Sequence, residues 1–188
     1  MAYGSSYGRQ KRKPIYDEKL GLPPTEEQNE KMEKQAKNVV TYWIEQSDKS
    51  RYELFTKIKN KGITDEIANK VLDKYEKLNY INDKRYAENF VYSKQTYDKL
   101  GAKAIGFKLR TKGVAQEIID EVLLTIDVDE EYENAKNIAL KKARSTTKLD
   151  NNKRIQQIAG MLARKGYSGS MIFNLAKEAI AEIDSEEN

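Results

Sequence analysis

Three short stretches of similar sequence decide the fold: KGITDEI at residues 61–67, KGVAQEI at 112–118 and KGYSGSM at 165–171. Their glycines are 51 and then 53 residues apart. Each glycine stands where a helix would end in a left-handed cap, and the lysine before it is favourable at the negative end of a helix dipole. Recurrence at this spacing predicts a chain built from three copies of one structural unit.

Apolar residues keep the same positions relative to these glycines. Eight residues before the glycine stand Leu54, Ile105 and Ile158, four before stand Ile58, Leu109 and Leu162, and five after stand Ile67, Ile118 and Met171. A spacing of four is helical, so each copy is expected to be a helix, a tight turn and a second helix. Ala36 and Ala87 both lie 26 residues before their glycine, which indicates that a further helix opens the unit.

No proline follows Pro24, as expected for uninterrupted helices joined by short turns. We predict an all-α fold of three tandem three-helix repeats, helix-turn-helix-like in their second and third helices, forming an elongated, curved array. The expected segments are a disordered basic arm at 1–24, repeats at 25–79, 80–126 and 127–183, and an acidic tail at 184–188. The arm carries a cationic run at 9–13 that either holds nucleic acid or is a solvated tail.

Missing residue types exclude several kinds of chemistry. The chain has no cysteine and no histidine, so disulfides, thiolate nucleophiles and the usual zinc ligands are excluded, and the most common general base is absent. There is no glycine-rich phosphate loop and no paired acidic motif. We therefore predict that the protein is not an enzyme and has no catalytic residue, metal or cofactor.

Composition also predicts where the protein resides. No apolar stretch approaches the roughly 20 residues that a membrane span needs. Charged residues make up 34% of the chain, which implies a large wetted surface. We expect a cytoplasmic protein with no membrane contact, and a monomer, because an extended array does not require a dimer.

Charge is segregated along the chain. Residues 84–113 contain eight Lys or Arg against two acids, and residues 140–166 contain eight against one. Residues 115–134 contain eight acids and no base. This pattern predicts separate basic and acidic surfaces, as in a protein that touches phosphates on one side. The alternative is that these charges form ordinary solvated helix faces.

The basic segments supply the candidate binding residues. In the second repeat they are Lys99, Lys103, Phe107, Arg110 and Lys112. On the helix expected at 101–112, Lys103, Phe107 and Arg110 share the face opposite the core, and an aromatic ring flanked by cations can stack a base while neutralising phosphate. The alternative is that Phe107 packs against the neighbouring repeat. In the third repeat the candidates are Lys141, Lys142, Arg144, Lys148, Lys153 and Arg154, for which the alternative is a charged loop and helix surface.

Two longer stretches carry a family resemblance. NYINDKRYAENFVYSKQ at 79–95, followed by GAKAIGFKLRTKGVAQEIIDEVL at 101–123, resembles the signature of the RecX family of bacterial recombination regulators. SRYELFTKIKNKGI at 50–63 and LARKGY at 162–167 fall where that family has related segments, so the resemblance covers about residues 33–182.

The resemblance implies a non-enzymatic, all-helical protein of three three-helix repeats that binds the RecA filament on DNA. Members of the family modulate, and mainly inhibit, the ATPase, strand-exchange and co-protease activities of RecA. The implied setting is homologous recombination, DNA repair and the SOS response. The implied partners are the RecA filament and single- and double-stranded DNA, bound weakly when RecA is absent.

Two other functions are compatible with the sequence. In the first, the chain is a stand-alone DNA-binding protein in which each glycine-turn pair is a helix-turn-helix with its second helix in the major groove. Against this function, Glu117, Asp120 and Glu121 make that helix acidic in the second repeat, and carboxylates repel phosphate. The second is a helical scaffold for unrelated proteins, which the periodicity alone also permits.

Overall fold

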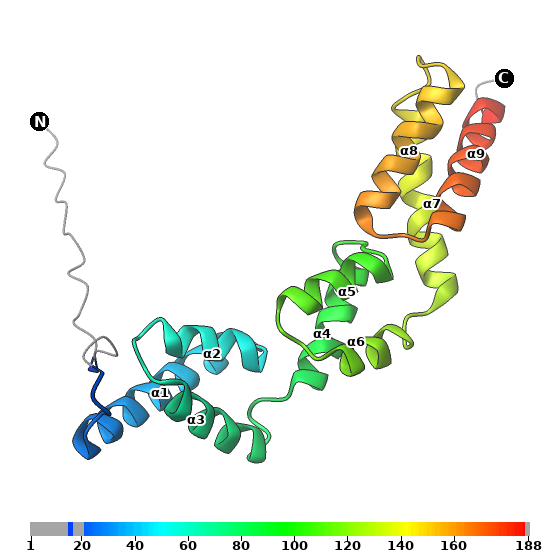
Figure 1. The fold of residues 1–188 in the computed structure, drawn as a ribbon. Helices are drawn as coiled ribbons and strands as arrows, with labels where there is room; N and C mark the ends of the chain where they lie inside the picture. The colour runs from blue at the N-terminus through cyan, green and yellow to red at the C-terminus, as the bar shows by residue number, and fades with distance from the viewer. Residues whose placement is uncertain (1–14, 17–20, 187–188) are drawn as a thin grey trace, which may run out of the picture. The chain divides into compact units, whose positions relative to one another are not determined.

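The computed structural model describes residues 15–16 and 21–186, and every regular element in these ranges is an α-helix (Figure 1). The helices of the first repeat are α1 (Glu26–Gln46), α2 (Arg51–Lys59) and α3 (Asp65–Lys77). Those of the second are α4 (Asp83–Thr96), α5 (Ala102–Thr111) and α6 (Gln116–Leu123). Those of the third are α7 (Val128–Arg144), α8 (Asn151–Lys165) and α9 (Gly169–Glu186). The all-α prediction is confirmed; the cationic run at 9–13 and the end of the predicted tail at 187–188 lie outside the described residues.

The three repeated glycines adopt the left-handed conformation that the sequence predicts. Their φ angles are +75° at Gly62, +72° at Gly113 and +88° at Gly166. A residue with a Cβ atom is strained at such angles, so glycine is the residue that allows a short turn between the second and third helices of each repeat.

The helices divide into two compact units. Among the described residues, one unit contains those up to Lys49 and Glu53–Ile81, and the other contains Ser50–Tyr52 and those from Asn82 onward. The first unit has one apolar core, which includes Met32, Leu54, Ile58 and Leu72. The second unit has two cores, one in α4–α6 around Ile105 and Leu109 and one in α7–α9 around Ile158 and Leu162. Each three-helix repeat therefore has an apolar core of its own.

The junction between the second and third repeats explains the lysine-glycine pair. The N–H of Gly101 donates to the carbonyl of Lys165 at 2.9 Å, and the N–H of Lys103 donates to the carbonyl of Gly166 at 3.2 Å. A Cβ atom on Gly166 would lie 2.3 Å from the backbone nitrogen of Ala104. The third glycine turn is thus fitted against the start of α5, with no space for a side chain.

Residues 50–52 meet the second glycine turn in the same way. The Ser50 hydroxyl donates to the carbonyl of Lys112 at 2.6 Å. A Cβ atom on Gly113 would lie 2.3 Å from the Cβ of Tyr52. Two of the three lysine-glycine pairs therefore serve as contact points against the residues that begin a helix of the preceding repeat.

Acidic residues near the starts of α4 and α7 accept hydrogen bonds from the free N–H groups at the starts of α2 and α5. Asp83 accepts from the N–H of Arg51 at 2.7 Å, and Glu131 accepts from the N–H of Ala102 at 2.7 Å. In the third repeat, α8 is capped by its own Asp150, which accepts from the N–H of Lys153 at 3.1 Å. The first N–H groups of a helix need such acceptors because they have no partner within the helix.

Candidate nucleic-acid interface

The basic face of the second repeat lies on α5. Lys103, Phe107 and Arg110 are exposed, whereas Ile105 and Leu109 on the same helix are fully buried. Phe107 is 63% exposed, so it does not pack against the third repeat, which lies in the same unit. The helical face predicted from the sequence is therefore present and solvent-exposed.

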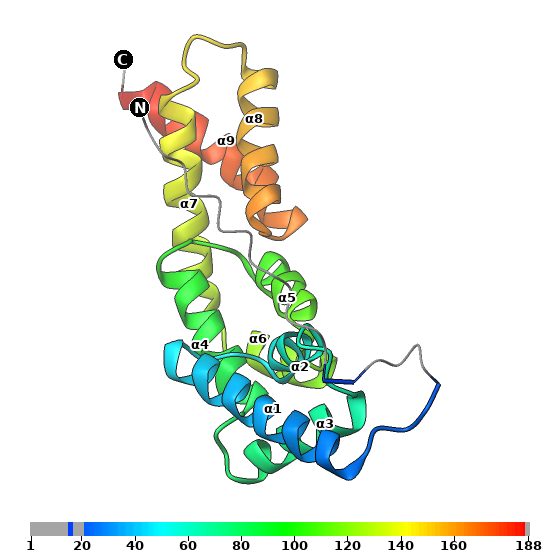
Figure 2. The ribbon, with the colours of Figure 1, turned by 90° about the vertical axis from the view of Figure 1, so that its left-hand side faces the viewer.

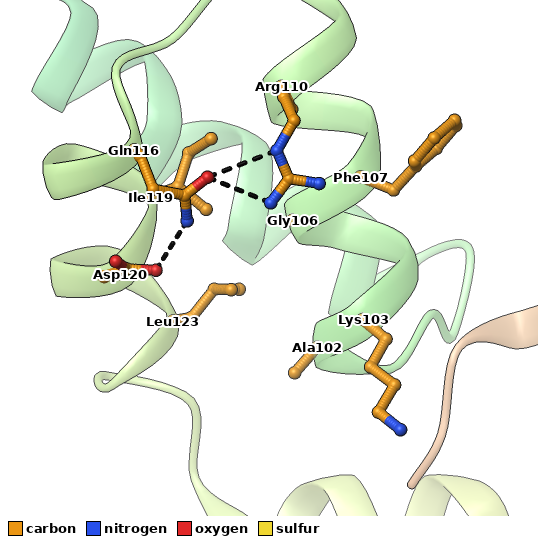
Figure 3. Close-up of a pocket in the computed structure, with 9 residues that line it drawn as sticks. All are labelled: Ala102, Lys103, Gly106, Phe107, Arg110, Gln116, Ile119, Asp120 and Leu123. Carbon is orange, nitrogen blue, oxygen red and sulfur yellow. Dashed lines mark hydrogen bonds between the residues drawn. The ribbon is translucent and has the colours of Figure 1, made fainter.

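The three side chains on this face do not form a single cluster. The Nε and Nη2 atoms of Arg110 donate to Oε1 of Gln116 at 3.2 and 2.9 Å, and Nε2 of Gln116 donates to Asp120 at 2.7 Å. Figure 3 shows the guanidinium turned toward α6, while the ring of Phe107 points away from that helix. The arrangement links Arg110 to Asp120 through the side chain of Gln116.

A groove of about 340 Å³ separates α5 from α6 beside Arg110. The two helices approach closely at Gly106, where a Cβ atom would lie 3.0 Å from Cδ1 of Leu123. Asp120 lines the groove together with Gln116. Because a carboxylate repels phosphate, this groove suits a mixed polar partner better than a DNA backbone.

Lys99 and Lys112 contribute backbone groups to the repeat junctions. Lys99 has a φ of +49°, and its carbonyl accepts from the hydroxyl of Tyr167 at 3.0 Å. The Lys112 carbonyl accepts from Ser50. Burial, together with the charge of Glu131, raises the pKa of Tyr167 to about 12. The structure thus assigns these two lysines a structural role through their carbonyls, and a role for their ammonium groups stays a prediction.

Arg154 is a correction to the predicted patch of the third repeat. Its side chain is 3% exposed, and Nη1 donates to both carboxylate oxygens of Asp184 at 2.8 and 3.0 Å. The helical turn of α8 places this residue against α9, on the side opposite the solvent. A buried cation held by a carboxylate cannot contact DNA, so Arg154 belongs to the core of the repeat.

The other five candidates are exposed or half-buried, and two of them have acidic partners. Arg144 pairs with Glu186 at 3.3 Å, and Lys153 pairs with Asp150 at 3.2 Å. The N–H and ammonium groups of Lys153 hold the pKa of Asp150 below its usual value. Lys141, Lys142 and Lys148 have no acid within ion-pair distance in the part of the chain that the structure describes.

Sequence reasoning missed three residues near Lys142. Gln156, Gln157 and Arg164 of α8 line a hollow with it. Arg164 lies in the basic segment 140–166, but the glutamines carry no charge and so gave no signal in a charge count.

In the described ranges, no group of three or more acidic side chains is arranged to hold a metal ion. None of the described helices combines the length and apolar character that crossing a bilayer takes.

Comparison with known proteins identifies the family. The model of the second three-helix domain of RecX matches residues 82–123, and that of the third domain matches residues 129–175. The regulatory protein RecX of Streptomyces coelicolor is 34% identical over 148 residues, covering 79% of each chain. The chain belongs to the RecX family. The RecX of Mycolicibacterium smegmatis is 31% identical over 153 residues, covering 79% of this chain and 81% of that protein.

Solved RecX structures share the fold. The crystal structure of RecX from Lactobacillus salivarius superposes with a TM-score of 0.73 at 23% identity, covering 79% of this chain and 97% of that one. A second RecX crystal structure gives a TM-score of 0.72. The two matched domains coincide with α4–α6 and with most of α7–α9. The chain is thus a RecX-type regulatory protein, and three-helix domains carry its candidate binding residues.

Proposed function

We propose that this RecX-family chain binds the RecA filament on DNA and restrains the ATPase, strand-exchange and co-protease activities of RecA. Membership of a family of regulatory proteins is the observation that carries the proposal. Such a protein acts in the cytoplasm, in DNA repair, recombination and the SOS response. In this proposal it works as a monomer whose repeats contact several filament subunits at once.

The exposed cations support contact with a partner that carries phosphate. Lys103 on α5 and Lys141, Lys142 and Lys148 in the third repeat are exposed or half-buried. None of the four has an acidic partner within 4 Å among the described residues. Lys and Arg side chains that neutralise DNA phosphates displace the counterions condensed on the DNA, which gives sequence-independent affinity. This is the behaviour needed on a filament that coats any sequence.

The second repeat does not favour binding of its helix α6 in the DNA major groove. Glu117, Asp120 and Glu121 are all exposed on α6, the second helix of the helix-turn-helix pair. A helix with three exposed acids would face the phosphates that line the groove. Weak binding to duplex DNA alone is therefore expected.

The decisive experiment is RecA ATP hydrolysis on single-stranded DNA, titrated with this protein at near-physiological salt. Inhibition at substoichiometric ratios is expected, because one molecule spans several subunits of the filament. Unchanged hydrolysis, together with ordinary salt-sensitive binding to duplex DNA, would overturn the proposal and favour the stand-alone DNA-binding alternative.

Charge reversal on α5 tests whether this face contacts the filament. Lys103→Glu combined with Arg110→Glu should weaken association with RecA-coated DNA by about tenfold or more, since two attractive contacts become repulsive. The helix should stay folded, because both side chains are exposed. The matched control is Lys177→Glu with Lys34→Glu, two exposed cations of α9 and α1. Wild-type affinity of the α5 variant in a binding titration would show that this face is misassigned.

A further inference from the structure

The hollow between α7 and α8 is a second basic feature, separate from the α5 face. We call it the α7–α8 hollow; it is lined by Lys142 of α7 and by Gln156, Gln157 and Arg164 of α8. Its volume is about 360 Å³. Figures 1 and 2 both show α8 lying alongside α7, which brings residues far apart in the sequence to one opening.

The charge of this hollow is positive and not balanced by its surroundings. Its lining contains two cations, two neutral amides and no carboxylate. Within the described chain, neither Lys142 nor Arg164 has an acid at ion-pair distance, whereas Arg144, Lys153 and Arg154 nearby all do. The two cations of the hollow are therefore available to an external anion.

Gly160 lies beside the residues of α8 that line the hollow. It lies four residues after Gln156 and four before Arg164, so the three share one helix face. Glycine inside a helix destabilises it relative to alanine. A Cβ atom at this position would meet only the Nη1 of Arg164, at 3.5 Å, which is ordinary contact. Packing does not require glycine at this position, and its small size leaves the backbone open to a ligand.

The residues that line the hollow favour nucleic acid over protein as its ligand. Protein interfaces centre on aromatic and apolar anchors, and none lines this hollow. Interfaces with DNA are polar and positively charged, with Lys and Arg on phosphates and amides on sugar or base edges. The glutamine amide can both donate and accept hydrogen bonds, so it can bond to a DNA strand of any sequence.

We infer that the α7–α8 hollow binds the sugar-phosphate backbone of a DNA strand. Lys142 and Arg164 each neutralise one phosphate, the two glutamine amides bond to the nucleotide between them, and Gly160 lets that nucleotide approach the helix. The inference rests on the proposed function, in which the chain meets DNA at the RecA filament, and it assigns the DNA contact to the third repeat.

The first test removes the two charges. Lys142→Gln with Arg164→Gln is compared with Lys34→Gln with Lys177→Gln, which removes the same charge from exposed sites outside the hollow. Binding of a fluorescent single-stranded oligonucleotide is measured by anisotropy, without RecA, over a range of salt concentrations. The hollow variant should lose at least about tenfold in affinity, and its log–log salt slope should fall by about 1.4, since each phosphate contact contributes about 0.7. The control should keep most of its affinity.

The second test adds bulk on α8 beside the hollow without changing its charge. Gly160→Leu should weaken DNA binding severalfold, while the thermal unfolding midpoint does not fall, because leucine is the better helix former. Gly160→Ala, with one methyl group, should bind almost as tightly as the wild type. The inference requires losses in both the charge variant and the leucine variant.

The outcomes separate this inference from the proposed function. Wild-type DNA affinity in either the charge variant or the leucine variant overturns the DNA assignment, even if the wild-type protein inhibits RecA. If both variants keep DNA affinity but bind RecA more weakly, the occupant is a protein surface and the DNA assignment is wrong. Failure of the wild type to inhibit RecA would refute the proposed function, whereas the anisotropy measurement would still report on the hollow.

Discussion

Replacing Gly166 with alanine should break the junction between the second and third repeats. The backbone at this position has a φ of +88°, which an alanine adopts only with strain of about 1–2 kcal/mol. The new Cβ atom would also lie 2.3 Å from the nitrogen and 2.4 Å from the Cβ of Ala104. Neither atom can rotate away, because one is backbone and the other is fixed directly to it.

The expected cost follows from what must move to relieve this contact. The glycine turn would have to withdraw from α5, and the bonds from Gly101 to Lys165 (2.9 Å) and from Lys103 to Gly166 (3.2 Å) would break. Each such bond contributes about 0.5–1.5 kcal/mol net. Together with the backbone strain, Gly166→Ala should lower the free energy of unfolding by about 2–5 kcal/mol.

Equilibrium urea unfolding, followed by far-ultraviolet circular dichroism, measures this loss. The matched control is Gly169→Ala, because a Cβ atom there would meet nothing within 4 Å and the residue begins α9. The control should be unchanged or stabilised by up to about 1 kcal/mol, as glycine is the weaker helix former. If Gly166→Ala unfolds within about 0.5 kcal/mol of the wild type, the turn is not fitted against α5 as described, and the explanation of the lysine-glycine pair fails.

Two further substitutions test the interior of the second unit. Asp184→Asn should lower the free energy of unfolding by about 2–3 kcal/mol, because it leaves the buried guanidinium of Arg154 without its counter-charge; a loss below about 0.5 kcal/mol in urea unfolding would contradict the pairing. Tyr167 has a pKa of about 12 in the folded state, above the ordinary value of 10, so its protonated form stabilises the fold below pH 10 and that contribution is lost as pH rises through 12. Tyr167→Phe should remove about 2 kcal/mol of pH dependence from the free energy of unfolding over this window, and identical pH profiles for variant and wild type would refute the burial of the hydroxyl.

The sequence predicts the helices because their information is local. Residues such as Leu54 and Ile58 stand four apart, which places them on one side of any helix, and burial of both follows from that spacing. The left-handed turns are equally local, since glycine has no Cβ atom to strain. The exposed face of Lys103 and Phe107 was predicted for the same reason.

Residue spacing is a poorer guide to the partners of charged residues. Arg154 lies in a basic stretch, yet the packing of α8 on α9 buries it against Asp184, thirty residues further on. Arg110 lies on an exposed face, but Gln116 from the next helix draws its guanidinium toward Asp120. A count of charges along the chain treats such residues as equivalent, whereas their partners depend on how two helices pack.

What the sequence by itself determined is the repeat: three glycine turns, the apolar positions around them and the blocks of charge, all of which depend on spacing along one helix. Only the tertiary structure decided how repeats join and which cations are left for a ligand. Asp83 and Glu131 cap helices of the preceding repeat, and Lys142 and Arg164 line one hollow from two different helices. The physical reason is that such contacts bring together residues more than 20 positions apart in the sequence, a separation at which helical periodicity carries no information about which side chains will meet.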